Sequence, residues 1–182
     1  MNLDEIIQGC IKNSIAHQKA LYTLYEKNLF NLSLKYCSNS QEAEDNLHDT
    51  FIEIFANIKK YKGNGSFEGW MKKIAINKAI SKFKSSSLNK PLNAIIYPVL
   101  DEDVAIDSDA LSLDFLLQLI QELPNQYRLV FNLYELDDYS HKEIAEMLSV
   151  SEGTSKSNLH KAKMILKNKI IASKTIKYKN GI

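Results

Sequence analysis

The chain contains few of the residues that build disulfide frameworks, metal sites and tight turns. Its 182 residues include two cysteines, three prolines and six glycines. Cys10 and Cys37 lack the CxxC spacing, so neither a disulfide framework nor a zinc site is expected, and a reducing interior fits. The cysteines and histidines are scattered without nucleophile–base or metal-ligand spacing, so we predict no metal, no cofactor and no enzymatic activity.

Long apolar runs and arginine are also scarce. No segment approaches the length of a membrane span, and the acidic start MNLDEII lacks the basic region of a signal peptide, so we expect a cytoplasmic protein without membrane insertion. Arg128 is the only arginine. The formal net charge is +1, but acids and lysines are segregated along the chain, which indicates surfaces of opposite sign.

The stretch from Tyr139 to Ile170 is predicted to form a helix-turn-helix. Ser140 and Glu143 have the spacing of a capping box, in which each side chain accepts a hydrogen bond from the other residue's backbone N–H. Ser151 offers a second N-cap a few residues later, so a short helix and a tight turn precede a longer helix. Such spacing is typical of DNA-reading helix-turn-helix motifs.

The second helix of this motif has two different faces at a period of 3.6 residues. The apolar face comprises Leu159, Ala162, Leu166 and Ile170, and the other face comprises Ser157, His160 and Lys161. From Ser151 to Lys179 there are eight lysines and one acid. The polar side chains suit base edges and the lysines suit phosphates. The alternative is a solvated amphipathic helix without a ligand.

A short helix is predicted over residues 3–11, and a longer one follows the interruption at residues 13–14 and ends at Tyr36. After a break at residues 38–40, an acidic helix is predicted to run toward Tyr61. Its apolar stripe comprises Ala43, Leu47, Phe51, Ile54 and Ile58. The rest of the helix carries the acids Glu42, Glu44, Asp45, Asp49 and Glu53, with no basic residue before Lys59. These acids form either a solvated face or a docking surface for a basic partner.

The sign of the charge reverses after this helix. The loop YKGNGSF, residues 61–67, has two glycines that permit close backbone approach, and its Ser66 caps the next helix. Aromatic residues interleaved with lysines suit single-stranded DNA, because bases stack on rings while lysines follow the backbone. The alternative is that Phe67 and Trp70 belong to the core, with Lys73, Asn77 and Lys84 on the other side of the helix.

The chain is predicted to be all-α, with two small helical domains joined by a flexible acidic linker. The linker, residues 85–110, contains two prolines, a serine run and five acids. The first domain spans residues 1–84. The second, residues 111–175, contains the helix-turn-helix and is followed by a basic tail, residues 176–182.

Several runs of sequence resemble one family. EIAEMLSVSEGTSKSNLHKAK and LPNQYRLVFNLYELDDYS resemble the fourth region of the extracytoplasmic-function (ECF) sigma factors of bacterial RNA polymerase, which reads the minus-thirty-five element. QEAEDNLHDTF resembles their second region, which binds the polymerase clamp helices. YKGNGSFEGWMKKIAINKA resembles the loop and helix that capture a flipped base and open the minus-ten element. The resemblance covers almost the whole chain outside the linker.

The resemblance implies three sets of binding residues. The polymerase-binding set is Asp45, His48 and Asp49. The minus-ten set is Lys62, Asn64, Ser66, Lys73 and Asn77. The minus-thirty-five set is Thr154, Lys156, Ser157, Asn158, His160 and Lys161. The implied partners are bacterial RNA polymerase core and promoter DNA, with an anti-sigma factor as a candidate regulator.

Some positions depart from the family pattern. Asp138 and Ser149 stand where glycine is usual, and we expect Ser149 to accept a left-handed conformation at a modest cost. Further departures are Asn46 for leucine, His48 for glutamine, Ser81 for a frequent aspartate, Ser155 for a buried apolar residue and Asn158 for arginine. Lys161 and Lys163 stand where arginine is usual, which keeps the charge but removes the planar fork. Arg128 is interpreted as a structural or phosphate-contacting residue.

The sequence therefore predicts an RNA polymerase sigma factor that directs core polymerase to specific promoters and initiates transcription. The alternative is a helix-turn-helix transcriptional regulator whose N-terminal domain binds another protein. That alternative explains the helix-turn-helix but not the basic loop with its aromatic residues.

Overall fold

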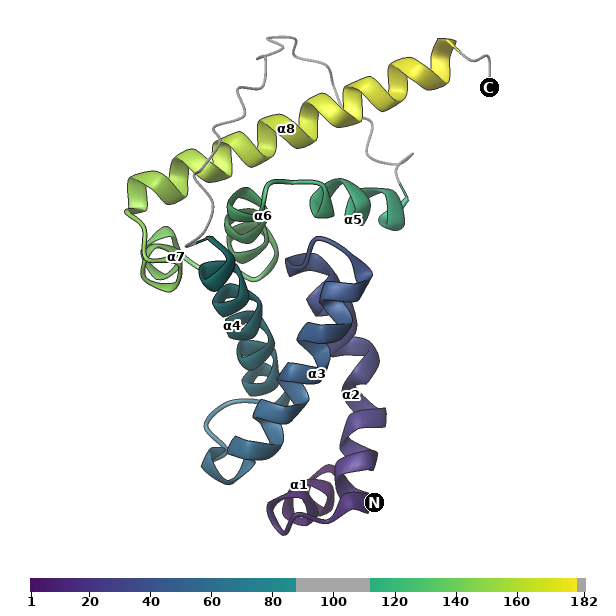
Figure 1. Ribbon diagram of the computed structural model, residues 1–182, viewed down its shortest axis with the longest axis vertical. Helices are drawn as coiled ribbons and strands as arrows, with labels where there is room; N and C mark the ends of the chain where they lie inside the picture. Colours follow the sequence, from purple (N-terminus) through teal and green to yellow (C-terminus); the bar gives the residue numbers. More distant parts are fainter. Residues whose placement is uncertain (88–111, 180–182) are drawn as a thin grey trace. The chain divides into compact units, whose positions relative to one another are not determined.

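The computed structural model describes residues 1–87 and 112–179, and these residues form helices and no strand (Figure 1). The predicted all-α class is confirmed for them. The chain divides into two compact units, with the boundary after Phe83. Residues 88–110 of the predicted linker, and 180–182 of the predicted tail, lie outside the described residues.

The N-terminal unit is built from α1 (Leu3–Ile11), α2 (Ile15–Tyr36), α3 (Ser40–Asn57) and α4 (Phe67–Ser87), with a short 3-10 helix, η1 (Ile58–Lys60), after α3. The helix starts follow local capping. The Asn2 side chain forms a capping box with Glu5 at the start of α1, and the Asn39 side chain accepts a hydrogen bond from the backbone N–H of Glu42 at the start of α3.

The corner between α1 and α2 depends on the conformation of Asn13 and on the absence of a side chain at Gly9. Asn13 takes a left-handed φ of 58° there, a conformation that asparagine tolerates better than most residues. A Cβ added at Gly9 on α1 would collide with the ring of His17 on α2. The two helices therefore pack closely only because position 9 is glycine.

The core of the N-terminal unit is formed by apolar side chains from all four helices. The predicted stripe of α3 is buried throughout, which confirms its register. The polar residues Ser33, Asn46 and Thr50 are also buried here, and Asn46 is 2% exposed. Its Nδ2 donates to Ser33 Oγ at 3.0 Å and to the carbonyl oxygen of Ala75 at 3.3 Å. Asn46, standing where the family has leucine, thus links α2, α3 and α4 through hydrogen bonds.

The C-terminal unit comprises α5 (Leu113–Gln121), α6 (Asn125–Phe131), α7 (His141–Leu148) and α8 (Glu152–Lys179). A π-helical segment, η3 (Asn132–Leu136), continues α6 and was not predicted. A cluster of Leu123, Tyr127, Ala162 and Ile165 packs α6 and its preceding turn against α8. Helix α8 continues to Lys179, so the first four residues of the predicted tail are helical.

Arg128 holds the corner between α5 and α6. Its side chain is 2% exposed. The guanidinium donates to the carbonyl oxygens of Gln121 at 2.7 Å and Leu123 at 3.0 Å, and to Asn125 Oδ1 at 2.8 Å. Carbonyl groups at a helix end carry partial negative charge, so a buried cation there is well placed. These bonds support the structural interpretation of Arg128.

The predicted caps of the helix-turn-helix are present. Ser140 and Glu143 form the capping box at the start of α7, and Ser151 Oγ accepts a hydrogen bond from the backbone N–H of Thr154 at 3.0 Å. Ser149 ends α7 in the left-handed conformation, with φ 57° and ψ 46°, as predicted. Asp138 also has a φ of 57°. Asp138 and Ser149, the two residues that replace a family glycine, therefore both have positive φ.

Candidate nucleic-acid interface

The first half of α8 presents most of the predicted minus-thirty-five residues to solvent. Lys156, Ser157, His160 and Lys161 are exposed, and Thr154 is half-buried. Lys161 Nζ lies 5.9 Å from the centre of the Tyr127 ring, a cation–π distance that favours one orientation of the lysine. This exposed face therefore combines hydrogen-bonding groups with cations, which is the chemistry that a DNA groove requires.

Asn158 differs from the other predicted contact residues because its side chain is only 6% exposed. Its Nδ2 atom has no hydrogen-bond partner among the residues that the structure describes. A family arginine at this position is long enough to carry its charge to the surface, whereas the shorter asparagine remains inside. Its burial argues against the direct base contact predicted for it.

A buried polar contact holds α8, the second helix of the helix-turn-helix and its expected DNA-recognition helix. The sequence did not predict this contact. Ser155, fully buried at the family's apolar position, is hydrogen-bonded to His141 Nδ1 at 2.9 Å. The His141 ring stacks on Tyr134 with centroids 4.4 Å apart and an interplanar angle of 18°. These residues come from α8, α7 and η3. They fix the start of the recognition helix against both neighbouring elements.

The basic loop of the N-terminal unit is closed by its own first residue. Tyr61 Oη donates to the carbonyl oxygen of Gly65 at 2.8 Å, and Gly63 and Gly65 have φ values of 75° and 87°. The predicted cap is present, because Ser66 Oγ accepts from the backbone N–H of Gly69 at 3.0 Å. The predicted loop residues, Lys62, Asn64 and Ser66, are all exposed.

The aromatic residues beside this loop divide between core and surface. Phe67 is buried, whereas Tyr61 and Trp70 are half-buried. The Tyr61 ring lies 5.0 Å from that of Phe67, and the Phe67 and Trp70 rings stack at 5.5 Å with an interplanar angle of 27°. The core interpretation therefore holds for Phe67. Tyr61 and Trp70 each keep part of their surface available for stacking with a base.

Helix α4 carries the other two residues predicted to bind the minus-ten element, Lys73 and Asn77, which are both exposed. Neighbouring lysines form ion pairs: Lys78 with Glu53 at 2.7 Å, Lys82 with Asp45 at 3.4 Å and Lys72 with Glu68 at 2.8 Å. The first two pairs connect α4 to α3. Exposed pairs of this kind contribute little stability, so they leave the lysines available to other anions.

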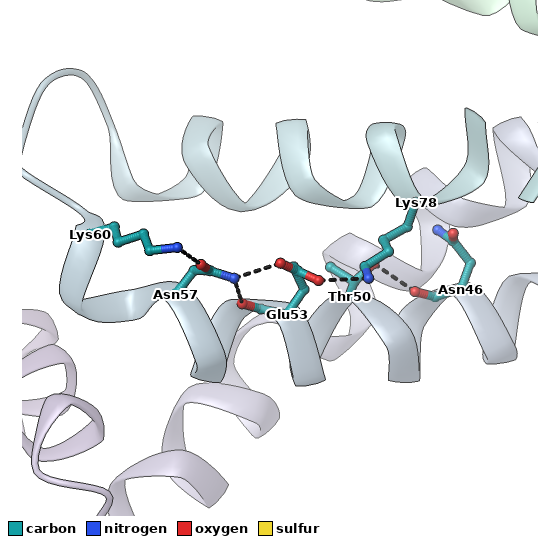
Figure 2. A network of polar contacts seen from close by, with 6 residues as sticks. All are labelled: Asn46, Thr50, Glu53, Asn57, Lys60 and Lys78. Atoms are coloured by element: carbon teal, nitrogen blue, oxygen red, sulfur yellow. Dashed lines mark hydrogen bonds and ion pairs between the residues drawn. The ribbon is translucent and has the colours of Figure 1, made fainter. Parts of the chain in front are cut away.

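Figure 2 shows a polar network that runs along α3 and reaches across to α4. Lys60 Nζ donates to Asn57 Oδ1 at 2.6 Å, and Lys78 pairs with the Glu53 carboxylate. Asn57 Nδ2 donates to the Glu53 carbonyl oxygen at 3.1 Å and also to its carboxylate. The hydrogen bond from Lys78, followed by its charge, lowers the pKa of Glu53 from its ordinary value. A lowered pKa favours the charged carboxylate of Glu53, and the ammonium of Lys78 balances that charge.

The predicted polymerase-binding residues lie on the adjoining face of α3, and Asp45 also reaches α4 through its pair with Lys82. Asp45, His48 and Asp49 are exposed. Ile52 is 68% exposed and follows Asp45, His48 and Asp49 by seven, four and three residues, so it shares their helix face. The sequence analysis did not select Ile52, although the signal was available, because this apolar residue falls outside the buried stripe. Exposed apolar residues among charges are typical of interface centres.

Two further properties bear on the class of protein. Among residues 1–87 and 112–179, no group of three or more histidine, cysteine, aspartate or glutamate side chains could hold a metal ion. Within the same ranges, no helix has the length and apolar character needed to cross a membrane. Cys10 and Cys37 are both buried, and neither is part of a disulfide.

A helix-turn-helix in one helical unit, and an exposed basic loop with aromatic residues in another, define an all-helical DNA-binding protein. Comparison with known families then gives the particular family. Residues 21–88 match Sigma-70 region 2, and residues 115–166 match Sigma-70, region 4. The chain belongs to the ECF sigma factors of bacterial RNA polymerase.

Relatives along most of the chain agree with this assignment. The ECF RNA polymerase sigma factor SigW of Bacillus subtilis is 28% identical over 159 residues, which cover 81% of this chain and 85% of SigW. The RNA polymerase sigma factor YlaC of the same organism is 26% identical over 85% of this chain and 92% of its own length. The sigma factor RpoE of Bartonella quintana, solved in complex with the anti-sigma factor NepR, shares the fold with a TM-score of 0.52 and 18% identity, covering 85% of this chain and 96% of RpoE.

Proposed function

We propose that this chain directs bacterial RNA polymerase core to specific promoters as an ECF sigma factor and initiates transcription in the cytoplasm. The observation that carries this proposal is the presence of both sigma regions, in order, on one chain. A regulator with an unrelated N-terminal module would match region 4 alone. As an initiation factor, the chain supplies binding surfaces while the polymerase supplies the chemistry.

The exposed face of α3 is the proposed polymerase-docking surface, made of Asp45, His48, Asp49 and Ile52. Its carboxylates complement a basic partner, which aids encounter and register. Ile52 adds an apolar side chain at the C-terminal end of this set, and burying it against a partner would exclude water and contribute to affinity. Lys82 competes for Asp45 in the free protein, but their exposed pair at 3.4 Å is easily exchanged for a partner's charge.

Two surfaces are proposed to bind promoter DNA. Lys62, Asn64 and Ser66 on the loop, with Lys73 and Asn77 on α4, engage the opened minus-ten element. Thr154, Lys156, Ser157, His160 and Lys161 on α8 engage the minus-thirty-five element as a duplex. Neither surface needs high affinity alone, because attachment to one polymerase raises the effective concentration of the second contact.

An anti-sigma factor is proposed as a third class of partner. The similarity to RpoE, whose structure was solved with the anti-sigma factor NepR, supports this proposal at the level of the fold. A partner that covers α3 would compete directly with polymerase. The expected observation is a protein that co-purifies with the free chain and is displaced by core polymerase.

Transcription in a reconstituted system tests the main proposal. The purified chain and bacterial core polymerase should give transcripts with defined start sites from a genomic DNA library without another sigma factor. A transcriptional regulator would give transcripts only when a second sigma factor is added. Absence of both core binding and transcripts would refute the proposal.

Two matched pairs of variants assign the surfaces. Ile52→Ser should weaken core binding, whereas Leu24→Ser, at a residue on α2 that is 54% exposed, should not. Lys161→Ala should weaken duplex binding and reduce the salt slope by about 1, while the exposed Lys19→Ala in the N-terminal unit removes the same charge without that change. Equal effects within a pair would contradict the assigned surface.

A further inference from the structure

The first turn of α8 faces the interior of its unit through a polar residue. Ser155 is 0% exposed and lies between Thr154 and Lys156, two of the residues proposed to bind the minus-thirty-five element. Its hydroxyl is hydrogen-bonded to His141 Nδ1 on α7 at 2.9 Å. Because Ser155 is buried, it cannot touch a base itself. Any effect of Ser155 on DNA reading must therefore pass through the position of its neighbours.

A hydrogen bond at this point restrains α8 in a way that apolar packing does not. A hydrogen bond has a preferred length and direction, whereas the hydrophobic effect is non-directional. Ser155 stands where the family pattern has an apolar residue, so this chain replaces a non-directional contact by a directional one. The start of α8 is thereby restrained in its rotation and depth relative to α7.

The imidazole that holds Ser155 is itself held. The His141 ring stacks on Tyr134 of η3 with centroids 4.4 Å apart and an interplanar angle of 18°. His141 is also the first residue of α7, directly after the N-cap Ser140. A side chain that is locked by its own neighbours can hold a binding residue to within about 0.5 Å. Tyr134 and His141 together therefore form a support beneath the first turn of α8.

The caps of α8 act on a different part of the geometry. Ser151 Oγ accepts a hydrogen bond from the backbone N–H of Thr154 at 3.0 Å and lies 2.9 Å from Thr154 Oγ1. These bonds connect α8 only to its own N-cap. They determine where the helix begins but not how it sits against α7. The bond between Ser155 and His141 does join the two helices.

We propose that His141 is a positioning residue for promoter recognition, acting through its bond to Ser155. The bond orients the neighbouring contact residues Thr154, Lys156 and Ser157, and so determines which base pairs the minus-thirty-five surface accepts. The inference rests on the proposed function and adds a determinant of promoter choice that lies beneath the DNA-binding face. Lysine contacts with phosphate act as point charges and tolerate a small displacement, whereas hydrogen bonds to base edges do not.

The test uses the full chain bound to core polymerase and a duplex that the wild-type complex selects from a random library. Fluorescence anisotropy gives a specificity ratio, defined as the affinity for the selected duplex divided by that for a scrambled duplex. Ser155→Val, which restores an apolar residue, should lower this ratio about tenfold, the size of one mismatched base pair. Affinity for the scrambled duplex, and its salt slope, should stay at the wild-type values.

The same variant separates positioning from folding. Circular dichroism during urea unfolding should give Ser155→Val a midpoint at or above that of the wild type, because valine buries more apolar surface and needs no hydrogen bond. A merely structural hydroxyl would lower specificity only as far as it lowered stability. Ser155→Ala, which cannot overpack the site, should show the same loss of specificity.

Matched changes at His141 test the hydrogen bond itself. The amide of asparagine can take the place of Nδ1, whereas glutamine carries its amide further out. His141→Asn should therefore retain more of the specificity ratio than His141→Gln, although both lose the ring. Adding Ser155→Ala to His141→Gln should lower the ratio no further, because the bond can be lost only once. Ser173→Ala, which removes a hydroxyl near the other end of α8, should keep the wild-type ratio.

Three results would overturn the inference. They are a wild-type ratio in both Ser155 variants, a ratio for His141→Asn as low as that for His141→Gln, and additive losses in the double variant. If the wild-type complex selects duplexes and initiates transcription while any of these is found, only the positioning role fails. If the wild-type chain neither binds core nor gives transcripts, the proposed function fails with it.

Discussion

The two helical units each bury an asparagine at a helix interface, but they treat its amide differently. In the N-terminal unit, Asn46 donates to Ser33 Oγ and to the Ala75 carbonyl oxygen. In the C-terminal unit, Asn158 Nδ2 lacks a hydrogen-bond partner within the described part of the chain. A buried polar group costs free energy unless it is paired. One asparagine therefore strengthens its interface, whereas the other weakens it.

The difference teaches how each departure from the family pattern acts. Asn46 replaces a leucine, and a serine on α2 supplies the hydrogen-bond partner that the new amide needs. Asn158 replaces an arginine that could extend to the surface. The shorter side chain removes a cation from the recognition helix and leaves a donor inside. The proposed minus-thirty-five surface would thus depend more on Lys156 and Lys161.

The comparison also provides a convenient measurement. The chain has a single tryptophan, Trp70, which lies on α4 of the N-terminal unit. Tryptophan fluorescence during urea unfolding therefore reports the N-terminal unit, while circular dichroism reports helices in both. A change confined to circular dichroism belongs to the C-terminal unit.

The largest effect is expected from Arg128→Met. This variant tests whether the stability of the C-terminal unit depends on hydrogen bonds made by a buried polar side chain, as that of the N-terminal unit does. Removing the guanidinium leaves the carbonyl groups of Gln121 and Leu123 without a charged donor, so unfolding free energy should fall by about 3 kcal/mol. The loss should appear in circular dichroism and not in Trp70 fluorescence. Arg128→Lys, which keeps the charge but loses the planar fork, should recover part of it. An unchanged midpoint would contradict the structural role.

Asn46→Leu, which restores the family residue, should destabilise the N-terminal unit by about 1 to 2 kcal/mol. The added apolar surface offsets only part of the loss, because the Ser33 hydroxyl and the Ala75 carbonyl lose a hydrogen-bond partner. Trp70 fluorescence during urea unfolding measures the effect. The double variant Asn46→Leu, Ser33→Ala should be more stable than Asn46→Leu alone. A stabilising single substitution would show that the pairing of Asn46 contributes nothing.

Asn158→Leu makes the same substitution in the C-terminal unit and should have the opposite sign. Replacing an unpaired buried donor by an apolar side chain should raise unfolding free energy by about 1 kcal/mol, measured by circular dichroism. Duplex DNA affinity should stay at the wild-type level, because the buried side chain does not reach the groove. Weaker DNA binding would mean that Asn158 turns outward in the complex.

The smallest effects are expected at the left-handed positions of the C-terminal unit. Ser149→Gly should stabilise by about 0.5 to 1 kcal/mol, because glycine adopts φ 57° without steric cost. Asp138→Gly should gain less, because aspartate tolerates this conformation better than serine. Chemical unfolding of both variants gives the ranking. Equal gains, or a loss at Ser149, would show that backbone strain does not set the stability of these two turns.

Features that depend on neighbours in sequence were predictable. The capping box of Ser140 and Glu143 and the cap at Ser151 involve residues three apart, so local chemistry determines them. The buried stripe of α3 followed from its period for the same reason. Ile52 was also predictable, because one apolar residue in an acidic helix face is visible in the sequence.

Features that depend on tertiary packing were not predictable. The burial of Asn158 depends on how the other helices of its unit cover α8, and the partner of Ser155 comes from another helix, fourteen residues away in the chain. The π-helical segment η3 needs a shifted backbone pattern that side-chain periodicity does not indicate. The exposure of Lys62, Lys73 and Lys161 agrees with the predicted DNA surfaces, and their contacts with DNA stay predictions.

The hydrogen bond from Tyr61 to Gly65 has a consequence for the speed of promoter engagement. A free loop would lose conformational entropy at the moment of binding, whereas this loop loses it during folding. Association would then be limited by diffusion and by strand opening, and not by a search among loop shapes. Without the Tyr61 hydroxyl the loop would lack this hydrogen bond and would have to be ordered during binding.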